Sequence, residues 1–297
     1  GPVLWSTDLM IHCSVNQQQA LGGLNGSHLD MLHQSPLCMG IAHQDAHAFF
    51  VADGTNGHIV RYDFQEPHVP GGDDHSDGRV SRYPELTFTR IPDIPSHMQV
   101  VGDELFYVDT GSGSLKVASI MTGNETNVLR PQNEPLELYN VIGGVNQRVL
   151  IEGLNTPSGL LVTDERIFIS FPLTGEIIAY DLEGDELERL ETGKPGVMGL
   201  TQSSQGEVWF VNAYEGTVNR ISPDAVEESD NTLPVSPSQG ECQYPQWGGQ
   251  IGLGHVLPPF AWSSSMKDSR LLGPLSTLNI FCDPEWADVE TVTFVVV

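Results

Sequence analysis

The stretch that decides the fold reads FFVADGTNGHIVRYD, at residues 49–63. An aromatic and β-branched run comes first, then a short polar stretch that ends in Gly57, then a second alternating run. Two alternating apolar runs on either side of a glycine-containing turn predict a β-hairpin. The same pattern returns in LFYVDTGSGSLKV (105–117), IFISFPLTGEIIAYD (167–181) and VWFVNAYEGTVNRI (208–221).

Each hairpin is preceded by a further strand signal that starts near a proline, at Pro36, Pro95, Pro157 or Pro195. An outer strand is predicted after the third hairpin, at 186–190. The turn glycines are 56, 62 and 41 residues apart, and about 40–50 residues per four-stranded unit is the period of a propeller blade. The sequence therefore predicts an all-β chain folded as a β-propeller. Its legible blades are 36–64, 95–122, 155–190 and 195–222.

The two longer intervals imply insertions at about 65–90 and 123–150. The blades resemble the NHL-repeat family of β-propellers, whose pattern is Pro-x-Gly-Ile-Ala, an aliphatic strand, and then Asp-x-x-Asn-x-Arg-Ile. Residues 53–59 match the last motif, with His58 at the arginine place. The resemblance covers about 36–222 and implies six blades, although a five-bladed ring also fits. The whole chain then forms one domain, in which the tail 223–297 supplies degenerate blades.

The charge of the chain excludes several classes of partner. Thirteen basic residues against 39 acidic ones give a formal net charge of −26, and only three of the basic residues are lysines. Binding to nucleic acid needs a Lys/Arg footprint on the phosphates, and docking on anionic membranes needs basic clusters. No apolar run reaches the roughly 18 residues of a membrane span. We therefore expect neither nucleic-acid binding nor membrane insertion.

Four cysteines in an acidic, lysine-poor chain favour an oxidising compartment, so we expect an extracellular or periplasmic protein. Three pairings of the four are conceivable. The spacing of Cys242 and Cys282 makes them the first candidates for a disulfide. Buried free thiols are the alternative.

The most unusual local feature is the density of histidine and aspartate, since six of the ten histidines lie between residues 43 and 97. Neutral imidazole is a ligand for zinc, copper or iron. The glycine-flanked carboxylates of 68–78 could wrap a hard cation such as calcium. The candidate metal ligands are His58, His68, His75, His97, Asp73, Asp74 and Asp77. Solvated or hydrogen-bonding side chains in polar loops are the alternative for each of them.

Among NHL-type enzymes, peptidylglycine alpha-amidating lyase holds zinc with histidines from different blades, and His58 sits at the corresponding turn position. The equivalent places in the other repeats hold Ser114, Glu176 and Thr217. Only one of the four equivalent positions is therefore a histidine, so the resemblance to a zinc-dependent lyase is partial.

Polar residues also recur where the second strand of a blade ends, as Asp53, Asp109 and Asn212. Side chains of this kind accept backbone N–H groups of a following turn. The alternative is that they line the mouth of the channel together with Cys38. Asp77 and Asp109 are then the candidate general bases.

These observations favour a secreted NHL-type propeller with a His/Asp-rich metal-binding face, acting as a module that binds a small-molecule or protein ligand. The metal is expected to be calcium, with zinc or copper as alternatives. A metal-dependent lyase or hydrolase with a His-held metal at the channel mouth is the second hypothesis. A purely structural, calcium-stabilised module is the third, since the fold alone does not decide function.

Overall fold

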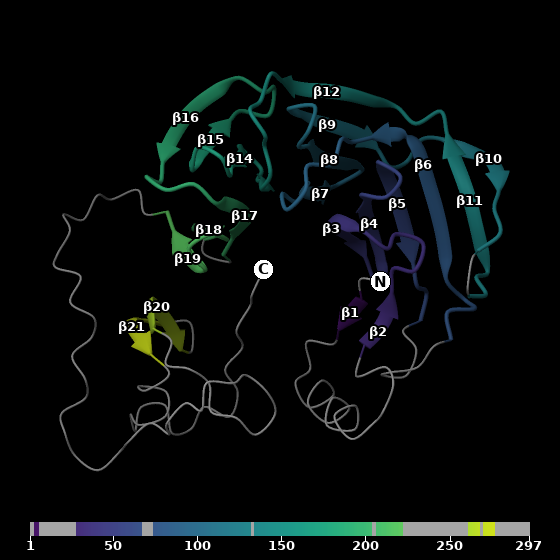
Figure 1. Cartoon of the computed structure of the whole chain (residues 1–297), viewed down its shortest axis with the longest axis horizontal. Helices are drawn as coiled ribbons and strands as arrows, with labels where there is room; N and C mark the ends of the chain where they lie inside the picture. The colour runs from purple at the N-terminus through teal and green to yellow at the C-terminus, as the bar shows by residue number, and fades with distance from the viewer. Residues whose placement is uncertain are drawn as a thin grey trace, which may run out of the picture. The chain divides into compact units, whose positions relative to one another are not determined.

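The computed structural model describes residues 3–5, 28–66, 74–131, 134–203, 206–221, 261–267 and 270–276. The chain divides into two compact units, residues 1–222 and 223–297. All the regular structure of the described residues is β-strand (Figure 1). No helix capable of crossing a membrane is found among them.

The first sheet of the larger unit is a blade with an extension. Four consecutive antiparallel strands form the blade, and two strands from later in the chain continue it to six. In sheet order the strands are β3 (Cys38–Asp45), β4 (Ala48–Asp53), β5 (His58–Asp63), β6 (Arg79–Thr87), β11 (Leu138–Gly143) and β10 (Asn124–Val128). Thus β6 falls within the expected insertion 65–90, and β10 and β11 fall within 123–150.

The next three sheets repeat the same antiparallel order. The second blade contains β7 (Met98–Val101), β8 (Glu104–Asp109), β9 (Ser114–Ser119) and β12 (Gln147–Glu152). The third contains β13 (Leu160–Val162), β14 (Ile167–Phe171), β15 (Glu176–Tyr180) and β16 (Glu186–Glu191), so the predicted outer strand 186–190 is present. The fourth has three described strands, β17 (Val197–Gln202), β18 (Val208–Asn212) and β19 (Thr217–Arg220).

Two short antiparallel pairs complete the described strands. In the larger unit, β1 (Val3–Trp5) pairs antiparallel with β2 (His28–Met31). In the smaller unit, β20 (Ala261–Lys267) pairs antiparallel with β21 (Arg270–Ser276). The proposed cysteine pair, Cys242 and Cys282, lies outside the described residues.

The blades pack face to face, which is why their strands are apolar on both sides. One core cluster joins Phe50 and Ile59 of the first blade to Leu105 and Tyr107 of the second. Another joins the opposite face of the second blade to the third, through Phe106, Val108, Ile167 and Ile169 among others. In a blade that is buried on both faces, the side chains on both sides of each strand must be apolar. The paired apolar runs read from the sequence have this origin.

Innermost strands of successive blades touch one another: β3 contacts β7, β7 contacts β13, and β13 contacts β17. In Figure 1, β3, β7 and β17 lie toward the middle, while β12, β16 and the β10–β11 extension lie on the outer margin. Successive antiparallel sheets that meet along their first strands are the arrangement of a propeller. The all-β propeller prediction is confirmed by this order and packing.

Hydrogen bonds to backbone carbonyls close the junction between blades. Ser96 donates its N–H to the carbonyl of Met39 at 2.8 Å, and the Ser170 hydroxyl donates to the carbonyl of Met198 at 2.8 Å. The approach is so close that a Cβ added to Gly40 would lie 2.0 Å from the carbonyl oxygen of Ser96. The repeated proline-led strand starts therefore mark the places where one blade meets the next.

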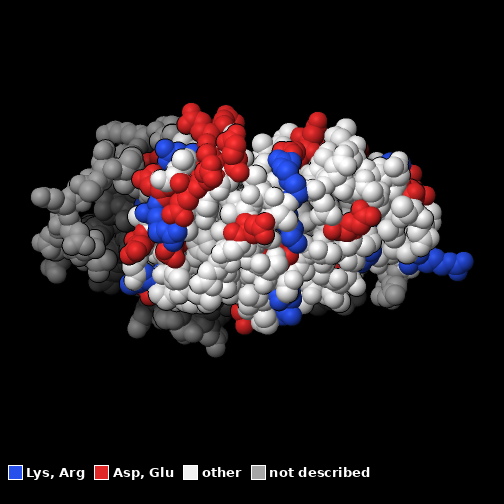
Figure 2. Space-filling model, turned by 90° about the horizontal axis from the view of Figure 1, so that it is seen from above, with Lys and Arg blue, Asp and Glu red and all other residues white. Residues whose placement is uncertain are grey.

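The outer surface carries much of the negative charge. Figure 2 shows acidic side chains on one face of the molecule, with basic side chains interspersed among them. In β16, for example, Arg189 lies 2.5 Å from Glu176 and 2.9 Å from Glu186. Most of the cations whose side chains the structure describes form such pairs with carboxylates near the surface.

Candidate metal centre

The polar residues at the strand ends hold their turns. Asp53 Oδ1 accepts the backbone N–H of Thr55 at 3.0 Å, and Asp109 Oδ1 accepts that of Ser112 at 3.0 Å. In the fourth blade, Asn212 Oδ1 accepts the backbone N–H groups of Tyr214 and Glu215. The interpretation of these side chains as turn acceptors is confirmed.

The candidate base Asp109 is held further by Lys116, whose Nζ lies 2.7 Å from Oδ2. Burial pushes the pKa of Asp109 up, but the hydrogen bonds from Lys116, Thr89 and Ser112 outweigh it and keep the pKa below its usual value. Cys38, another candidate for the channel mouth, is a half-buried free thiol whose Sγ–H donates to the carbonyl of Gly40 at 3.3 Å. Burial raises its pKa.

His58 and His97 lie apart from any cluster of metal-binding side chains in the described part of the chain. His58 Nε2 accepts a hydrogen bond from Arg82 Nη1 at 3.0 Å. Its pKa is lowered by burial and by the Arg82 charge. His97 Nδ1 donates to the carbonyl of Ser158 at 3.2 Å, beside Gly199 of β17, and burial lowers its pKa as well. Both rings are therefore neutral at neutral pH.

The loop before β6 contains three of the candidates that the structure describes. Asp74 Oδ1 accepts the N–H of Ser76 at 3.1 Å, and Asp77 Oδ2 accepts that of Glu66 at 3.2 Å. His75 is buried, and it joins two residues that the sequence reasoning did not single out. His68 and Asp73 lie outside the described residues.

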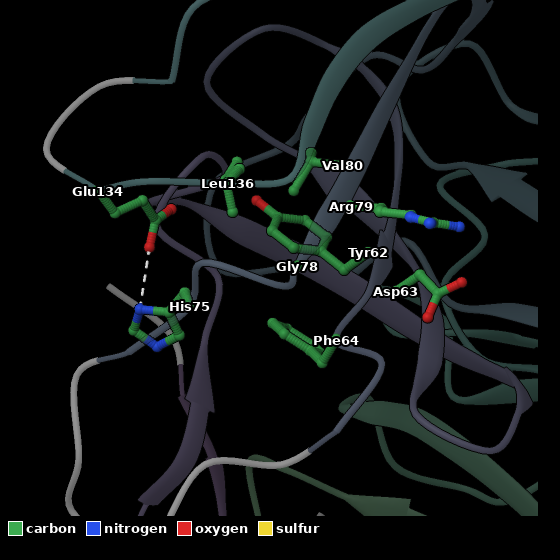
Figure 3. A pocket seen from close by; sticks show the side chains of 9 residues that line it. All are labelled: Tyr62, Asp63, Phe64, His75, Gly78, Arg79, Val80, Glu134 and Leu136. Atoms are coloured by element: carbon green, nitrogen blue, oxygen red, sulfur yellow. Dashed lines mark ion pairs between the residues drawn. The ribbon is translucent and has the colours of Figure 1, made fainter.

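These two partners are His33 and Glu134. His33 Nδ1 lies 2.5 Å from Glu134 Oε2, and His75 Nδ1 lies 3.1 Å from the same oxygen. The His33 and His75 rings meet edge to face, with centroids 5.1 Å apart. One ligand atom from each of the three residues lies within 4.8 Å of the others. Figure 3 shows His75 facing the carboxylate of Glu134.

The strand order explains how three distant segments meet here. Strand β11 runs parallel to β6, so the segments that precede the two strands lie at the same end of the sheet. The segment before β6 supplies His75, and the segment before β11 supplies Glu134. A backbone hydrogen bond of 3.0 Å from Glu137 N to the carbonyl of Gly78 ties the two segments together.

His33 comes from the loop between β2 and β3. That loop is anchored at Ser35, whose N–H donates to the carbonyl of Leu32 at 3.0 Å and whose hydroxyl accepts from buried Tyr62 at 2.9 Å. The loop also supplies Gln34, whose side-chain amide donates to Glu134 Oε1 at 3.0 Å. All three segments are thus fixed by contacts other than those of the group itself.

The carboxylate at the centre is strongly buried, with 5% of the Glu134 side chain and 3% of the His75 side chain exposed. Burial alone would raise the pKa of Glu134. Hydrogen bonds from His75 and Gln34, together with the charge of His33, outweigh burial and lower the pKa. Glu134 is therefore ionised at neutral pH, as a metal ligand must be.

The ligand atoms lie close enough together to hold a small divalent cation. Zinc binds imidazole nitrogen and carboxylate oxygen at about 2.0–2.2 Å, so two ligands of a tetrahedral ion lie about 3.3 Å apart. The separations of 2.5 and 3.1 Å between the nitrogens and Oε2 need only a small opening to reach that value. A cavity of about 10 Å³ borders His75 and Glu134 on the side of Tyr62 and Leu136, about the space of one water molecule.

On its other side the group adjoins a larger cleft of about 430 Å³, to which His33 contributes. The His33 side chain is 29% exposed, whereas the other two ligands are almost fully covered. A metal held by this group would therefore have two buried protein ligands and one at the edge of an open cleft. Three protein ligands beside an open position are typical of catalytic zinc sites, whereas structural sites are closed by four.

No protein-family model and no curated protein sequence matches this chain. Among solved structures it is similar to a streptogramin B lyase, with 13% identity, a TM-score of 0.42, and coverage of 66% of this chain and 54% of the other. Virginiamycin B lyase from Staphylococcus aureus shows 14% identity and a TM-score of 0.38, with coverage of 67% and 70%. Myxococcus xanthus glutaminyl cyclase shows 14% identity and a TM-score of 0.39, with coverage of 64% and 67%.

The chain spans about half the length of the streptogramin B lyase chain. At these identities and TM-scores the likeness carries no information about activity. The strand order and the packing between blades define the chain as a β-propeller protein. Its described part contains one side-chain group suited to a metal ion, formed by His33, His75 and Glu134.

Proposed function

We propose that this chain is a metal-binding β-propeller in which His33, His75 and Glu134 hold a divalent cation. The observation that carries the proposal is the convergence of two imidazole nitrogens on one oxygen of a buried, ionised carboxylate. In this proposal the metal organises a binding face, and the adjoining cleft receives a ligand or partner.

The donor set favours zinc over calcium. Calcium prefers six to eight oxygen ligands, whereas two of the three ligands here are imidazole nitrogens. Zinc and copper accept imidazole readily, and zinc forms tetrahedral sites with mixed nitrogen and oxygen ligands. We therefore propose zinc as the physiological cation and copper as its main competitor.

The wider setting is also part of the proposal. The low lysine content and the four cysteines support a secreted protein of the NHL type. Asn124, in the glycosylation sequon Asn-Glu-Thr, lies exposed on β10 at the edge of the sheet. An exposed asparagine of this kind suits a protein that passes through the secretory route.

A metal-dependent hydrolase or lyase is the second candidate, and the open cleft beside His33 favours it. Zinc held by these residues would supply Lewis-acid activation of water near neutral pH. The candidate base Asp77 belongs to the same loop as His75, with its Oδ2 engaged by Glu66 N at 3.2 Å. Zinc-dependent hydrolysis of a chromogenic ester by the native protein, and its loss in His75→Gln, would favour the enzyme over the binding module.

Zinc titration of the chelator-treated protein by calorimetry tests the metal site directly. We expect one zinc per chain, and at least about a 100-fold loss of affinity in His75→Gln, since loss of a group that merely orients a ligand already costs 10–100-fold. His43→Gln is the matched control, because His43 is exposed on β3 and bonds only a nearby carbonyl, that of Ala46, at 3.1 Å.

Two results would overturn the proposal. One is the absence of any stoichiometric zinc or copper binding by the wild-type protein. The other is equal zinc affinity in wild type, His75→Gln and His43→Gln, which would place the metal elsewhere. Thermal unfolding gives a second readout, because a metal that binds only the folded state raises the melting temperature.

A further inference from the structure

The cleft beside His33 differs in charge from the rest of the chain. It is lined by His33, Gln34, Pro36, Thr55, Asn56, Arg82, Leu129, Arg130 and Tyr139. Among these described lining residues there are two arginines and no aspartate or glutamate. In a chain with 39 acidic and 13 basic residues, this lining presents basic side chains to the cleft and no acidic ones.

Arg82 forms the fixed floor of this cleft. Its Nη1 lies 2.8 Å from Asp53 Oδ2, and its other nitrogens donate to the hydroxyl of Tyr139 and the carbonyl of Gln34. The Arg82 guanidinium also lies over the Tyr139 ring, 5.6 Å from its centroid. The charge of Arg82 is thus balanced by Asp53. Its contacts fix the position of Tyr139, whose hydroxyl accepts from Arg82 and keeps its own proton to donate.

Arg130 is different, because it has no carboxylate partner in the described part of the chain. Nearly every other cation described there is paired with a carboxylate: Arg61, Arg79, Arg82, Lys116, Arg148, Arg166, Arg189, Lys194 and Arg220. Among the cations whose side chains the structure describes, the one further exception is Arg90, which does not line the cleft. An exposed, unpaired guanidinium at a concave site is a ready partner for an oxyanion, which it can bind with two parallel hydrogen bonds.

We propose that this cleft binds a small oxyanion, a carboxylate or a phosphate, through Arg130 and the Tyr139 hydroxyl. We further propose that the bound anion faces the cation held at His33. This part of the inference rests on the proposed metal site. The metal cation and Arg130 then lie on either side of the anion. Arg82 lies beneath it and holds Tyr139 in place. Such a site selects ligands by their anionic group and leaves the remaining volume for the rest of the molecule.

Calorimetric titration with inorganic phosphate and with succinate, each against the apo protein and the protein loaded with one equivalent of zinc, tests this inference. We expect at least one of the two anions to bind, and to bind more tightly in the presence of zinc. The tighter of the two identifies whether the cleft prefers phosphate or carboxylate. Arg130→Gln should weaken anion binding by about tenfold or more, since charge-assisted hydrogen bonds contribute about 1.5–3 kcal/mol.

The controls separate this inference from the metal site. Arg130→Gln should leave zinc affinity unchanged, because Arg130 is not among the metal-binding side chains. Arg130→Lys should retain part of the anion affinity, and Arg148→Gln, which removes a paired surface charge of the second blade, should retain all of it.

Failure of both anions to bind, or binding that Arg130→Gln leaves unchanged, overturns the inference while zinc binding can still stand. Anion binding that depends on Arg130 in a protein that binds no zinc supports the anion site and overturns the proposed metal function. Equal anion affinity in the apo and zinc-loaded protein overturns the part of the inference that places the anion against the cation.

Discussion

Nδ1 of His75 lies 3.1 Å from Oε2 of Glu134, and this contact joins the segments that precede two parallel strands. Most neighbouring strands of the sheet are antiparallel. Residues that meet at one end of such a pair usually belong to the two sides of one turn. The parallel pairing of β11 with β6 instead places two separate loops side by side. The metal-binding group is a consequence of that one pairing.

Replacing Glu134 by glutamine should destabilise the protein by about 1–3 kcal/mol at pH 7, because two buried polar partners lose an ionised acceptor. The folded-state pKa of Glu134 is below its usual 4.5. The ionised carboxylate therefore stabilises the folded protein fully above about pH 4.5. This contribution is lost as the pH falls through the folded-state pKa. Urea unfolding of the metal-free protein and of the variant, at pH 7 and again near pH 3, measures this difference.

The difference in unfolding free energy between wild type and Glu134→Gln should shrink at the lower pH. A constant difference at both pH values would show that the ionised carboxylate is not what stabilises the group. Glu137→Gln is the control, since Glu137 forms only an exposed pair with Arg79. It should change stability little at either pH.

Loss of Arg82 should cost far more than loss of a surface arginine. In Arg82→Met the fully buried side chain of Asp53 would lose its cation, which typically costs about 3–5 kcal/mol. Arg148→Met removes an exposed pair with Glu104 and should stay within about 1 kcal/mol. Chemical unfolding of the two variants provides the comparison. Equal losses would contradict the role of Arg82 as the anchor of the cleft.

The junction between blades can be tested with two glycines of inner strands. A Cβ at Gly40 of β3 would meet the carbonyl oxygen of Ser96 at 2.0 Å, whereas a Cβ at Gly199 of β17 finds its nearest neighbours at 3.8 Å or beyond. We expect Gly40→Ala to destabilise by about 1–3 kcal/mol through overpacking. Gly199→Ala should be neutral or slightly stabilising. Thermal melts of both variants decide the matter, and a harmless Gly40→Ala would argue against the observed approach of the first two blades.

The repeats made the blades predictable from the sequence, and the physical reason is local. Each hairpin needs a residue with positive φ at the end of its turn, and Gly57 (φ 70°) and Gly113 (φ 68°) have it. The acceptor that begins the turn, such as Asp53, lies four residues before that glycine. The glycine recurs in all four hairpins and the acceptor in three of them, since the third has Phe171 at that place. Local hydrogen bonding of this kind can be read without knowing which strands are neighbours.

The metal-binding group could not be predicted in the same way. The density of histidines between 43 and 97 pointed to His75 but away from His33, which lies just outside that region. Glu134 lies in a stretch interpreted as an insertion, and no local pattern distinguishes it from other glutamates. Only the parallel pairing of β11 with β6 places it beside His75, and pairing between distant strands leaves no mark on the spacing of residues.

A zinc-edge anomalous diffraction map of a crystal soaked in zinc tests the central claim most directly. The account predicts a strong peak about 2.0–2.2 Å from Nδ1 of His33, Nδ1 of His75 and Oε2 of Glu134. Crystals of His75→Gln should lose that peak. An occupied zinc position elsewhere, with these three side chains still hydrogen-bonded to one another, would contradict the account.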